Sequence, residues 1–409
     1  MDNDIKSCIT AISKVVIEDG IAIYFQPVVS LLSKTVIGFE AFARGIDESG
    51  ETLVSPACLF NSALPIKAQL KIEEVCLSKS LEAYKPLYDK YRDIILFLNI
   101  NSNIYSRDEY KVRSPHQLAA SYKYFPNMIT LEMDAAHLAN NIPFEMITAA
   151  KEHGYKISID NVDGSAECAK ILKCINPDFV KFDSKIYQDM GGAEGIKDEL
   201  VTFVADLSRR GITPVAKGVE KEREAVTLAQ AGFNLQQGYF YADSSSASGR
   251  SDSFSDKINR VSHTLRESNK NSIKLQQEIF REVHLLLKST MTRLQQEEDG
   301  EMNRILEELI KKNLKIISAY ILSASGRQLT KRFAGKAGDP LGMKLVNSAV
   351  GSDHSDSEIF IYLNSGFEKI AGSHEPDALC RSGYNYIAGF FYKDGSRRGR
   401  ILILDYINS

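Results

Sequence analysis

Polar side chains suited to metal binding and acid–base chemistry follow a series of short apolar runs in the chain before residue 243. They are Glu40, Asn99, Glu132, Asp160, Lys181, Asp183, Lys217 and Glu220. Carboxylate and amide oxygens are the ligands that hard divalent cations prefer. A single such residue after a strand often caps the next helix, but capping does not explain so many positions at once. We therefore predict that these side chains share one oxygen-rich site.

The elements that must position these side chains alternate between short strands and helical segments. The expected strands are Ile21–Val29, Val36–Phe42, Ile94–Asn99, Met128–Glu132, Lys156–Asp160, Phe179–Asp183, Thr213–Ala216 and one near Gly238–Tyr241. The expected helices include Ala68–Tyr84, Phe144–His153, Asp198–Arg210 and Glu222–Ala231. This alternation predicts an α/β fold, a (β/α)8 barrel whose C-terminal strand ends meet at one mouth. Only a few residues join the first two strands, which fits an antiparallel hairpin.

The residues around these strand ends resemble the EAL domain family of bacterial cyclic di-GMP phosphodiesterases. The matching motifs are Tyr24-Phe-Gln26-Pro-Val, Gly38-Phe-Glu40-Ala41-Phe42-Ala-Arg44, Leu131–Asp134, Ile159–Asn161, Val180–Asp183, Ala216–Glu220 and Gln237–Tyr239. The resemblance covers residues 18–245 and implies a TIM-type barrel with one antiparallel strand. It also implies that two divalent cations, Mg²⁺ or Mn²⁺, assist hydrolysis of one phosphodiester of cyclic di-GMP.

The resemblance implies a role for each matching residue. The metal-ligand positions are Glu40, Asn99, Glu132 and Asp160. The catalytic positions are Lys181, which orients or deprotonates the water, and Glu220, which lies near the metals. The positions expected to hold the nucleotide are Gln26, Phe42, Arg44, Asp183, Lys217 and Gln237. Among these, Arg44 suits a phosphate because a guanidinium offers paired donors.

Two departures from the family pattern change the charge of the expected site. Asn161 stands where active members have a metal-binding aspartate, and Lys217 stands where they have a glutamate. Together they shift the site by three units toward positive charge. At ~4 Å and an effective dielectric constant near 20, two unit charges interact by about 4 kcal/mol, so an inward lysine opposes a divalent cation. A lysine that points out of the mouth would leave the site intact, but its place at a strand end favours the inward orientation. We predict that two-metal catalysis is lost.

The chain after residue 243 predicts a polar linker, a long connector helix and a smaller domain. Residues 243–255 are rich in serine, and Asp256–Glu298 carries apolar residues at helical spacing. This helix could form a dimer coiled coil or pack against a partner domain. A helix at Glu301–Lys312 and strands at Leu314–Ala324, Ser357–Leu363, Tyr384–Tyr392 and Arg400–Asn408 follow. Their order resembles α+β sensory domains of the PAS-like or Cache-like kind.

Length and composition agree with this division. The 409 residues exceed one ordinary domain, and we expect a barrel over residues 1–243, a linker and connector helix over residues 244–300, and a sensory domain over residues 301–409. The net charge of −3 argues against a DNA- or RNA-binding protein. No run of 18 apolar residues occurs, so no membrane span is expected. Six cysteines without a CxxC pair predict scattered thiols in the cytoplasm.

Three functional hypotheses follow, and all concern cyclic di-GMP signalling. The leading one is a degenerate EAL protein without phosphodiesterase activity that acts as a nucleotide receptor or binds a protein partner, with no metal cofactor needed. The second is an active, weak, metal-dependent phosphodiesterase. The third is a scaffold that has lost nucleotide binding as well. The long helix and the family resemblance both favour a homodimer.

Overall fold

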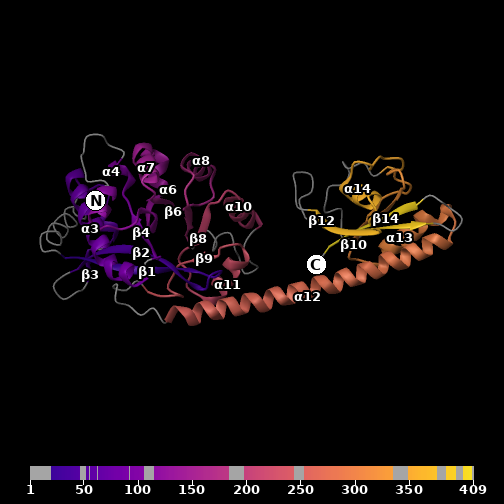
Figure 1. The fold of residues 1–409 in the computed structure, drawn as a ribbon, viewed down its shortest axis with the longest axis horizontal. Coiled ribbons are helices and arrows are strands. Elements are labelled where there is room, and N and C mark those ends of the chain that lie inside the picture. The colour runs from indigo at the N-terminus through magenta and orange to yellow at the C-terminus, as the bar shows by residue number, and fades with distance from the viewer. Residues whose placement is uncertain are drawn as a thin grey trace. The chain divides into compact units, whose positions relative to one another are not determined.

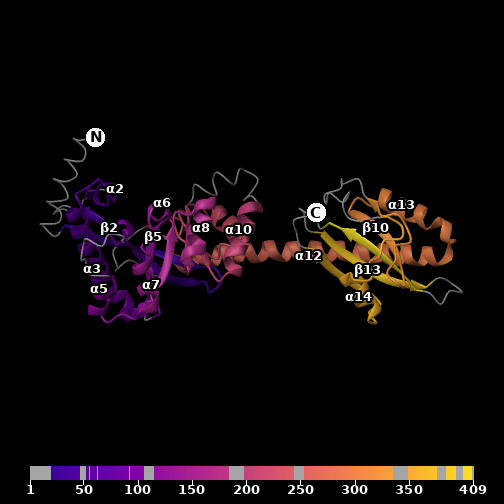
Figure 2. The same cartoon turned by 90° about the horizontal axis from the view of Figure 1, so that it is seen from above.

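The computed structural model describes residues 20–46, 52–54, 56–61, 63–91, 93–105, 115–183, 198–243, 253–334, 349–374, 384–392 and 399–407. The chain divides into two compact units, Met1–Glu267 and Ser268–Ser409. Figures 1 and 2 show the ribbon from two directions, with the first unit running from indigo through magenta to salmon. Each unit is considered by itself.

Eight strands close the barrel of the first unit. They are β1 (Ile21–Ser30), β2 (Thr35–Ile46), β4 (Ile95–Asn99), β5 (Ile129–Asp134), β6 (Lys156–Asp160), β7 (Phe179–Phe182), β8 (Thr213–Ala216) and β9 (Leu235–Gln236), and the short β3 (Thr52–Val54) pairs with β2. Neighbouring strands follow the order β1-β9-β8-β7-β6-β5-β4-β2, and β1 also pairs with β2, which closes the circle. Strand β1 is antiparallel to both neighbours, whereas the other barrel pairs are parallel. The predicted barrel with one antiparallel strand is confirmed.

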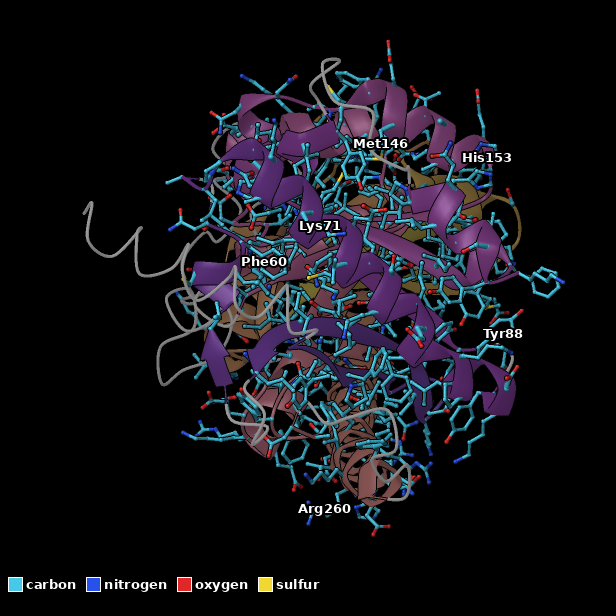
Figure 3. The ribbon with its side chains drawn as sticks, turned by 90° about the vertical axis from the view of Figure 1, so that its left-hand side faces the viewer. Phe60, Lys71, Tyr88, Met146, His153 and Arg260 are labelled. Atoms are coloured by element: carbon cyan, nitrogen blue, oxygen red, sulfur yellow. The ribbon has the colours of Figure 1, made fainter. Side chains whose placement is uncertain are left out.

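Helices cover the outside of the barrel (Figure 1). They are α2 (Pro56–Leu59), α3 (Ile66–Tyr91), α4 (Ser102–Tyr105), α5 (Pro115–Ser121), α6 (Ala135–Asn140), α7 (Phe144–Glu152), α8 (Ala166–Ile175), α10 (Asp198–Arg209) and α11 (Glu222–Gln230), with a 3₁₀ turn η1 (Pro126–Met128). Helix α8 shows why the sequence forms them: Ser165 caps its first turn by accepting the N–H of Cys168, and Asn176 ends it in the left-handed conformation. Figure 3 faces α3, which Lys71 and Tyr88 mark.

The long helix α12 (Ser253–Gln296) begins in the first unit. Its first turns bury Phe254, Ile258 and Val261 in the same apolar core as the barrel helices. In the second unit, Ile279 and Val283 of α12 pack with α13 (Met302–Lys312) against one face of a sheet. None of the described helices is both long and apolar enough to cross a membrane.

The second unit is built on a five-stranded antiparallel sheet. The strand order is β11-β10-β14-β13-β12, with β10 (Ile316–Ser323), β11 (Phe333–Ala334), β12 (Lys369–His374), β13 (Tyr384–Tyr392) and β14 (Gly399–Tyr406). A 3₁₀ turn η2 (Asp299–Glu301) precedes α13. Helix α14 (Glu358–Asn364) packs through Ile359, Phe360 and Leu363 on the face opposite α13.

Several sequence predictions about elements need correction. The last barrel strand is Leu235–Gln236, and Gly238–Tyr241 forms the turn after it. The segment predicted as a strand over Ser357–Leu363 is the helix α14. Cys58 is disulfide-bonded, so the expectation of scattered thiols is wrong at that residue, whereas Cys76, Cys168 and Cys174 are free thiols. Most of the predicted linker and of the hairpin loop at Lys393–Gly399 lies outside the described residues.

Candidate functional site

The barrel strands bring most of the predicted polar residues to one mouth. Strand register places Gln26 opposite Glu40 and Asn99 opposite Glu132. Asp160 is the last residue of β6, and the chain leaves β8 and β9 directly before Lys217 and Gln237. Because these strands are neighbours in the closed barrel, their ends form one ring rather than separate sites.

A cavity of about 790 Å³ opens at this ring. Its polar lining includes Gln26, Glu40, Glu73, Ser80, Asn99, Asn101, Glu132, Asp134, His137, Asp160, Asn161, Asp183, Lys217 and Gln237. Its apolar lining includes Ala41, Phe42, Ala43, Phe60, Cys76, Leu77, Leu98 and Ile100. A volume of this size suits a ligand of several hundred daltons, with apolar walls and a few polar groups that fix orientation.

Lys181 lies at the centre of a buried ion cluster beneath the cavity. Its side chain is fully buried, and its Nζ lies 2.6 Å from Oε2 of Glu40 and 2.6 Å from Oε2 of Glu132. The ammonium also lies 4.7 Å from the centre of the Phe97 ring. Burial alone would lower the pKa of Lys181, but the surrounding carboxylates Glu132 and Glu40 raise it above its ordinary value. The lysine therefore stays charged.

Lys217 supplies a second ammonium, and this one faces the cavity. Its Nζ lies 2.6 Å from Oδ2 of Asp160, with side-chain exposures of 20% for Lys217 and 12% for Asp160. Burial acts to lower the pKa of Lys217, but the carboxylates of Asp160 and Glu40 raise it overall. The inward orientation that the sequence predicted is the one observed.

Side-chain amides complete the ring around Glu40. Asn99 donates from Nδ2 to Oε1 of Glu40 at 3.0 Å, and Gln237 donates from Nε2 to Oε2 at 2.8 Å. The same Gln237 nitrogen lies 3.1 Å from Oε1 of Gln26. Oε1 of Gln237 is buried and has no hydrogen-bond partner within the part of the chain that the structure describes. That acceptor is available to a donor from a bound molecule.

The three carboxyl groups of the ring respond differently to these neighbours. Burial raises the pKa of Glu40, but Lys181 and Lys217 outweigh burial and hold it below the ordinary value. Burial and the neighbouring Glu40 raise the pKa of Glu132 to about 8. Burial raises the pKa of Asp160 in spite of Lys217. Of the three groups, Glu40 is therefore the one whose ionised form the neighbouring ammonium groups favour overall.

These residues do not fit a pair of divalent cations. Every ring carboxyl already lies against an ammonium group, Glu40 and Glu132 against Lys181 and Asp160 against Lys217. Across the described ranges, no three His, Cys, Asp or Glu side chains are arranged to hold a metal ion. The protein's own cations therefore already occupy positions beside the oxygen ligands.

Asn161 occupies an unusual position beside this ring. Its backbone lies in the left-handed region, with φ of 56°, which asparagine tolerates better than most residues. Its Nδ2 donates to Oδ2 of Asp134 at 2.5 Å. The side chain is thus held by Asp134, which also caps α6 by accepting the N–H groups of Ala136 and His137.

Three predicted site residues do not line the cavity: Lys181, which lies beneath it, Glu220 and Arg44. Glu220 is exposed at the start of α11, where its backbone N–H donates to Glu224. Arg44 lies on the same face of β2 as Glu40 and Phe42, directly after the lining residue Ala43, but does not itself line the cavity. Phe42 and Asp183 do line the cavity, together with the predicted polar ring.

The sequence reasoning missed the contribution of α3. Glu73, Cys76, Leu77 and Ser80 follow helical spacing, are buried, and line the cavity. Oε1 of Glu73 accepts the backbone N–H of Asn101 at 3.1 Å, and burial raises the pKa of Glu73 to about 7. The sequence did contain a sign of this contribution: Glu73 lies within an apolar helical stripe, and an acidic residue is rarely buried without a partner.

Comparisons with known proteins give a family match for the barrel. Residues 10–244 match the model of the EAL domain. Two curated relatives from Escherichia coli (strain K12) are Probable cyclic di-GMP phosphodiesterase PdeI, 24% identical over 237 residues, and Probable cyclic di-GMP phosphodiesterase PdeB, 22% identical over 230 residues. These alignments cover 53% and 54% of this chain but only 28% and 42% of the relatives.

Two solved structures show the likeness of fold. The Bacillus subtilis YkuI protein with an EAL domain, in complex with substrate c-di-GMP and calcium, matches at a TM-score of 0.71 and 15% identity, over 95% of this chain and 96% of that one. The Xanthomonas citri FimX EAL domain in complex with c-diGMP matches at 0.52 and 18% identity, over 61% of this chain and 98% of that one.

Proposed function

Since the chain belongs to the EAL domain family, we propose that it is a cyclic di-GMP signalling protein whose barrel binds the nucleotide and does not hydrolyse it. The observation that carries this proposal is the pair formed by Lys217 and Asp160, with 2.6 Å between Nζ and Oδ2. The pair sets an ammonium group at a strand end that lines the cavity.

Charge argues against hydrolysis assisted by two metal ions. Glu40, Glu132 and Asp160 carry at most three negative charges, and Lys181 and Lys217 carry two positive ones, which leaves −1. Two divalent cations would bring four more positive charges into this partly buried cluster. At ~4 Å and an effective dielectric constant near 20, each ammonium opposes a divalent ion by about 8 kcal/mol before relaxation. Even a quarter of that value lowers metal affinity more than tenfold.

The ammonium group of Lys217 at the cavity wall favours an anionic ligand. Lys217 lines the cavity and, as a flexible point charge, can reach a phosphate oxygen while remaining close to Asp160. The unpartnered Oε1 of Gln237 offers an acceptor to a ribose hydroxyl or a base N–H. An ammonium in place of a metal ion therefore gives the site an affinity for phosphodiesters without activating a water.

The α3 side of the cavity suits a guanine base. Phe42 and Phe60 offer flat apolar surfaces on which a base can stack. Glu73 offers a carboxyl oxygen to the N1–H and N2–H₂ donors of guanine, in a buried place where an unsatisfied donor would be costly. Figure 3 labels Phe60 at this side of the unit, near α3.

The experiment that tests nucleotide binding is isothermal titration of cyclic di-GMP into the full chain with divalent cations chelated. We expect saturable heat in chelator, and a loss of affinity of roughly tenfold or more in Lys217→Met, because a charged hydrogen bond to phosphate is removed. Lys170→Met is the matched control, because Lys170 is exposed on α8 and does not line the cavity.

Two results would contradict the proposal. Absence of heat and of competition at high nucleotide concentration would leave the scaffold hypothesis, in which the barrel binds only a protein. Heat that appears only after Mg²⁺ or Mn²⁺ is restored would show that the cluster admits a metal, which favours the active phosphodiesterase.

A further inference from the structure

Gln26 joins the cavity to the segment that follows the last barrel strand. It lines the cavity, and its Oε1 lies 3.1 Å from Nε2 of Gln237. Its own Nε2 donates to the backbone carbonyl of Ala242 at 3.2 Å. One side chain therefore contacts both the polar ring and the chain that leaves the barrel.

The segment from Gln237 to Ala242 is a short, well-anchored connection. Phe240 donates its N–H to the carbonyl of Val219, and the buried Tyr241 donates from its hydroxyl to Oε1 of Gln236 at 2.7 Å. Gly238, with φ of 157°, lets the backbone pass so close to Val219 that a Cβ atom would lie 2.2 Å from the Val219 carbonyl oxygen. These contacts hold the segment against Val219 and Gln236.

The first turns of α12 are fastened to the same segment. Lys257 donates from Nζ to the carbonyl of Tyr241 at 3.0 Å. Phe254, Ile258 and Val261 bury their side chains in the core that also contains Tyr241. Lys257 and Gln26 therefore donate to the carbonyls of two consecutive residues, Tyr241 and Ala242.

We propose that an anionic nucleotide in the cavity draws the Gln26 amide away from Ala242 and thereby loosens the attachment of the first turns of α12. This inference rests on the proposed function, because it needs a ligand in the cavity. Without nucleotide, the Gln26 amide donates to the Ala242 carbonyl. With nucleotide bound, the same amide donates to the ligand. The output is α12, whose later residues pack on the sheet of the second unit.

Thermodynamic linkage determines whether a change at the start of α12 raises or lowers the affinity for the nucleotide. If nucleotide binding loosens this attachment, a change that loosens it beforehand must tighten nucleotide binding by the same factor. Lys257→Met removes the bond to Tyr241 but keeps most of the aliphatic stem, and Lys257 does not line the cavity. One lost hydrogen bond corresponds to a factor of roughly two to ten, so we expect the variant to bind cyclic di-GMP tighter by up to that factor.

The test is hydrogen–deuterium exchange of the full-length protein with and without saturating cyclic di-GMP, read in peptides that cover residues 253–265. In the wild type, exchange should rise when nucleotide binds. In Lys257→Met it should already be high without nucleotide and rise little on binding. Lys274→Met, an exposed lysine further along α12, is the control and should behave as the wild type.

The outcomes separate this inference from the proposed function. Heat of binding together with unchanged exchange over residues 253–265 would overturn the inference alone. Equal nucleotide affinity in the wild type and Lys257→Met would overturn it as well, because the coupling would be absent. No binding of any kind would overturn the proposed function and this inference with it.

Discussion

At the residue scale, Lys217 places a positive charge at the mouth of the barrel because it points inward. The sequence predicted that orientation from its place directly after a strand, and the 2.6 Å contact with Asp160 agrees. The partners of Lys181 were not predictable, because they come from two strands that meet only in the closed barrel. Glu220 was misplaced because it lies in the loop between β8 and α11, where it is exposed.

The buried cluster around Lys181 gives the first stability prediction. Lys181→Met leaves Glu40 and Glu132 facing each other without their counterion, and breaking a buried ion pair in this way costs about 3–5 kcal/mol. We expect a clear drop in the thermal midpoint of the barrel. The matched control is Lys85→Met, which breaks a surface pair with Asp89 at the same 2.6 Å and should cost about 0–1 kcal/mol. Equal losses in both variants would contradict the account.

Glu73 gives a pH prediction. Burial raises its pKa from 4.5 to about 7 in the folded protein, so the folded chain binds more protons than the unfolded chain between these values. Stability from this residue is therefore greatest at low pH and falls as pH rises from about 4.5 through 7. The difference in pKa corresponds to about 3 kcal/mol.

Glu73→Gln keeps the shape of the side chain and its acceptor for Asn101 but removes the titration. The urea midpoint of the wild type should decrease between pH 5 and pH 8 by more than that of the variant. Identical pH profiles for the two proteins would show that Glu73 does not titrate in this range.

At the element scale, periodicity found the long elements and failed on a short one. The first seven barrel strands and α12 were predicted close to their observed positions, because each has a sustained apolar pattern, whereas the two-residue β9 was misplaced. Ser357–Leu363 was predicted as a strand because Ile359, Phe360 and Ile361 favour β structure. The capping bond from Phe360 N–H to Ser357 Oγ, and burial of Ile359, Phe360 and Leu363 on one face, make it a helix.

The capping hydrogen bond from the Phe360 N–H to Ser357 Oγ can be tested by substitution. Ser357→Ala removes the acceptor for the first turn of α14 and should destabilise the second unit by about 1 kcal/mol. Ser289→Ala, at an exposed position within α12, is the control and should be neutral or slightly stabilising, since alanine favours helix. A thermal midpoint of the second unit that is unchanged in Ser357→Ala would indicate that packing alone holds α14.

At the scale of the whole molecule, the order of a barrel, a long helix and a smaller sheet unit was readable from the sequence, because composition and period change along the chain. The homodimer stays a prediction. The part of α12 in the second unit exposes Ile273 and Phe280, seven residues apart and thus on one helical face, with exposures of 53% and 37%. Exposed apolar side chains repeated on one face are typical of a helix that contacts a partner.

Light scattering coupled to size exclusion tests this prediction. The wild type should have twice the chain mass of 45.6 kDa. Ile273→Lys combined with Phe280→Lys should return the mass to that of one chain, while Lys274→Met leaves it unchanged. A monomeric wild type, or a dimer that survives both substitutions, would contradict the proposed contact.

The central claim is that Lys217 and Asn161 have removed hydrolysis from an otherwise intact barrel. The most direct measurement is a cyclic di-GMP hydrolysis assay in Mn²⁺ or Mg²⁺ on the wild type beside Lys217→Glu with Asn161→Asp. We predict no linear dinucleotide from the wild type above the rate without protein, and measurable product from the double variant. Product from the wild type that disappears in Glu40→Ala would contradict the claim.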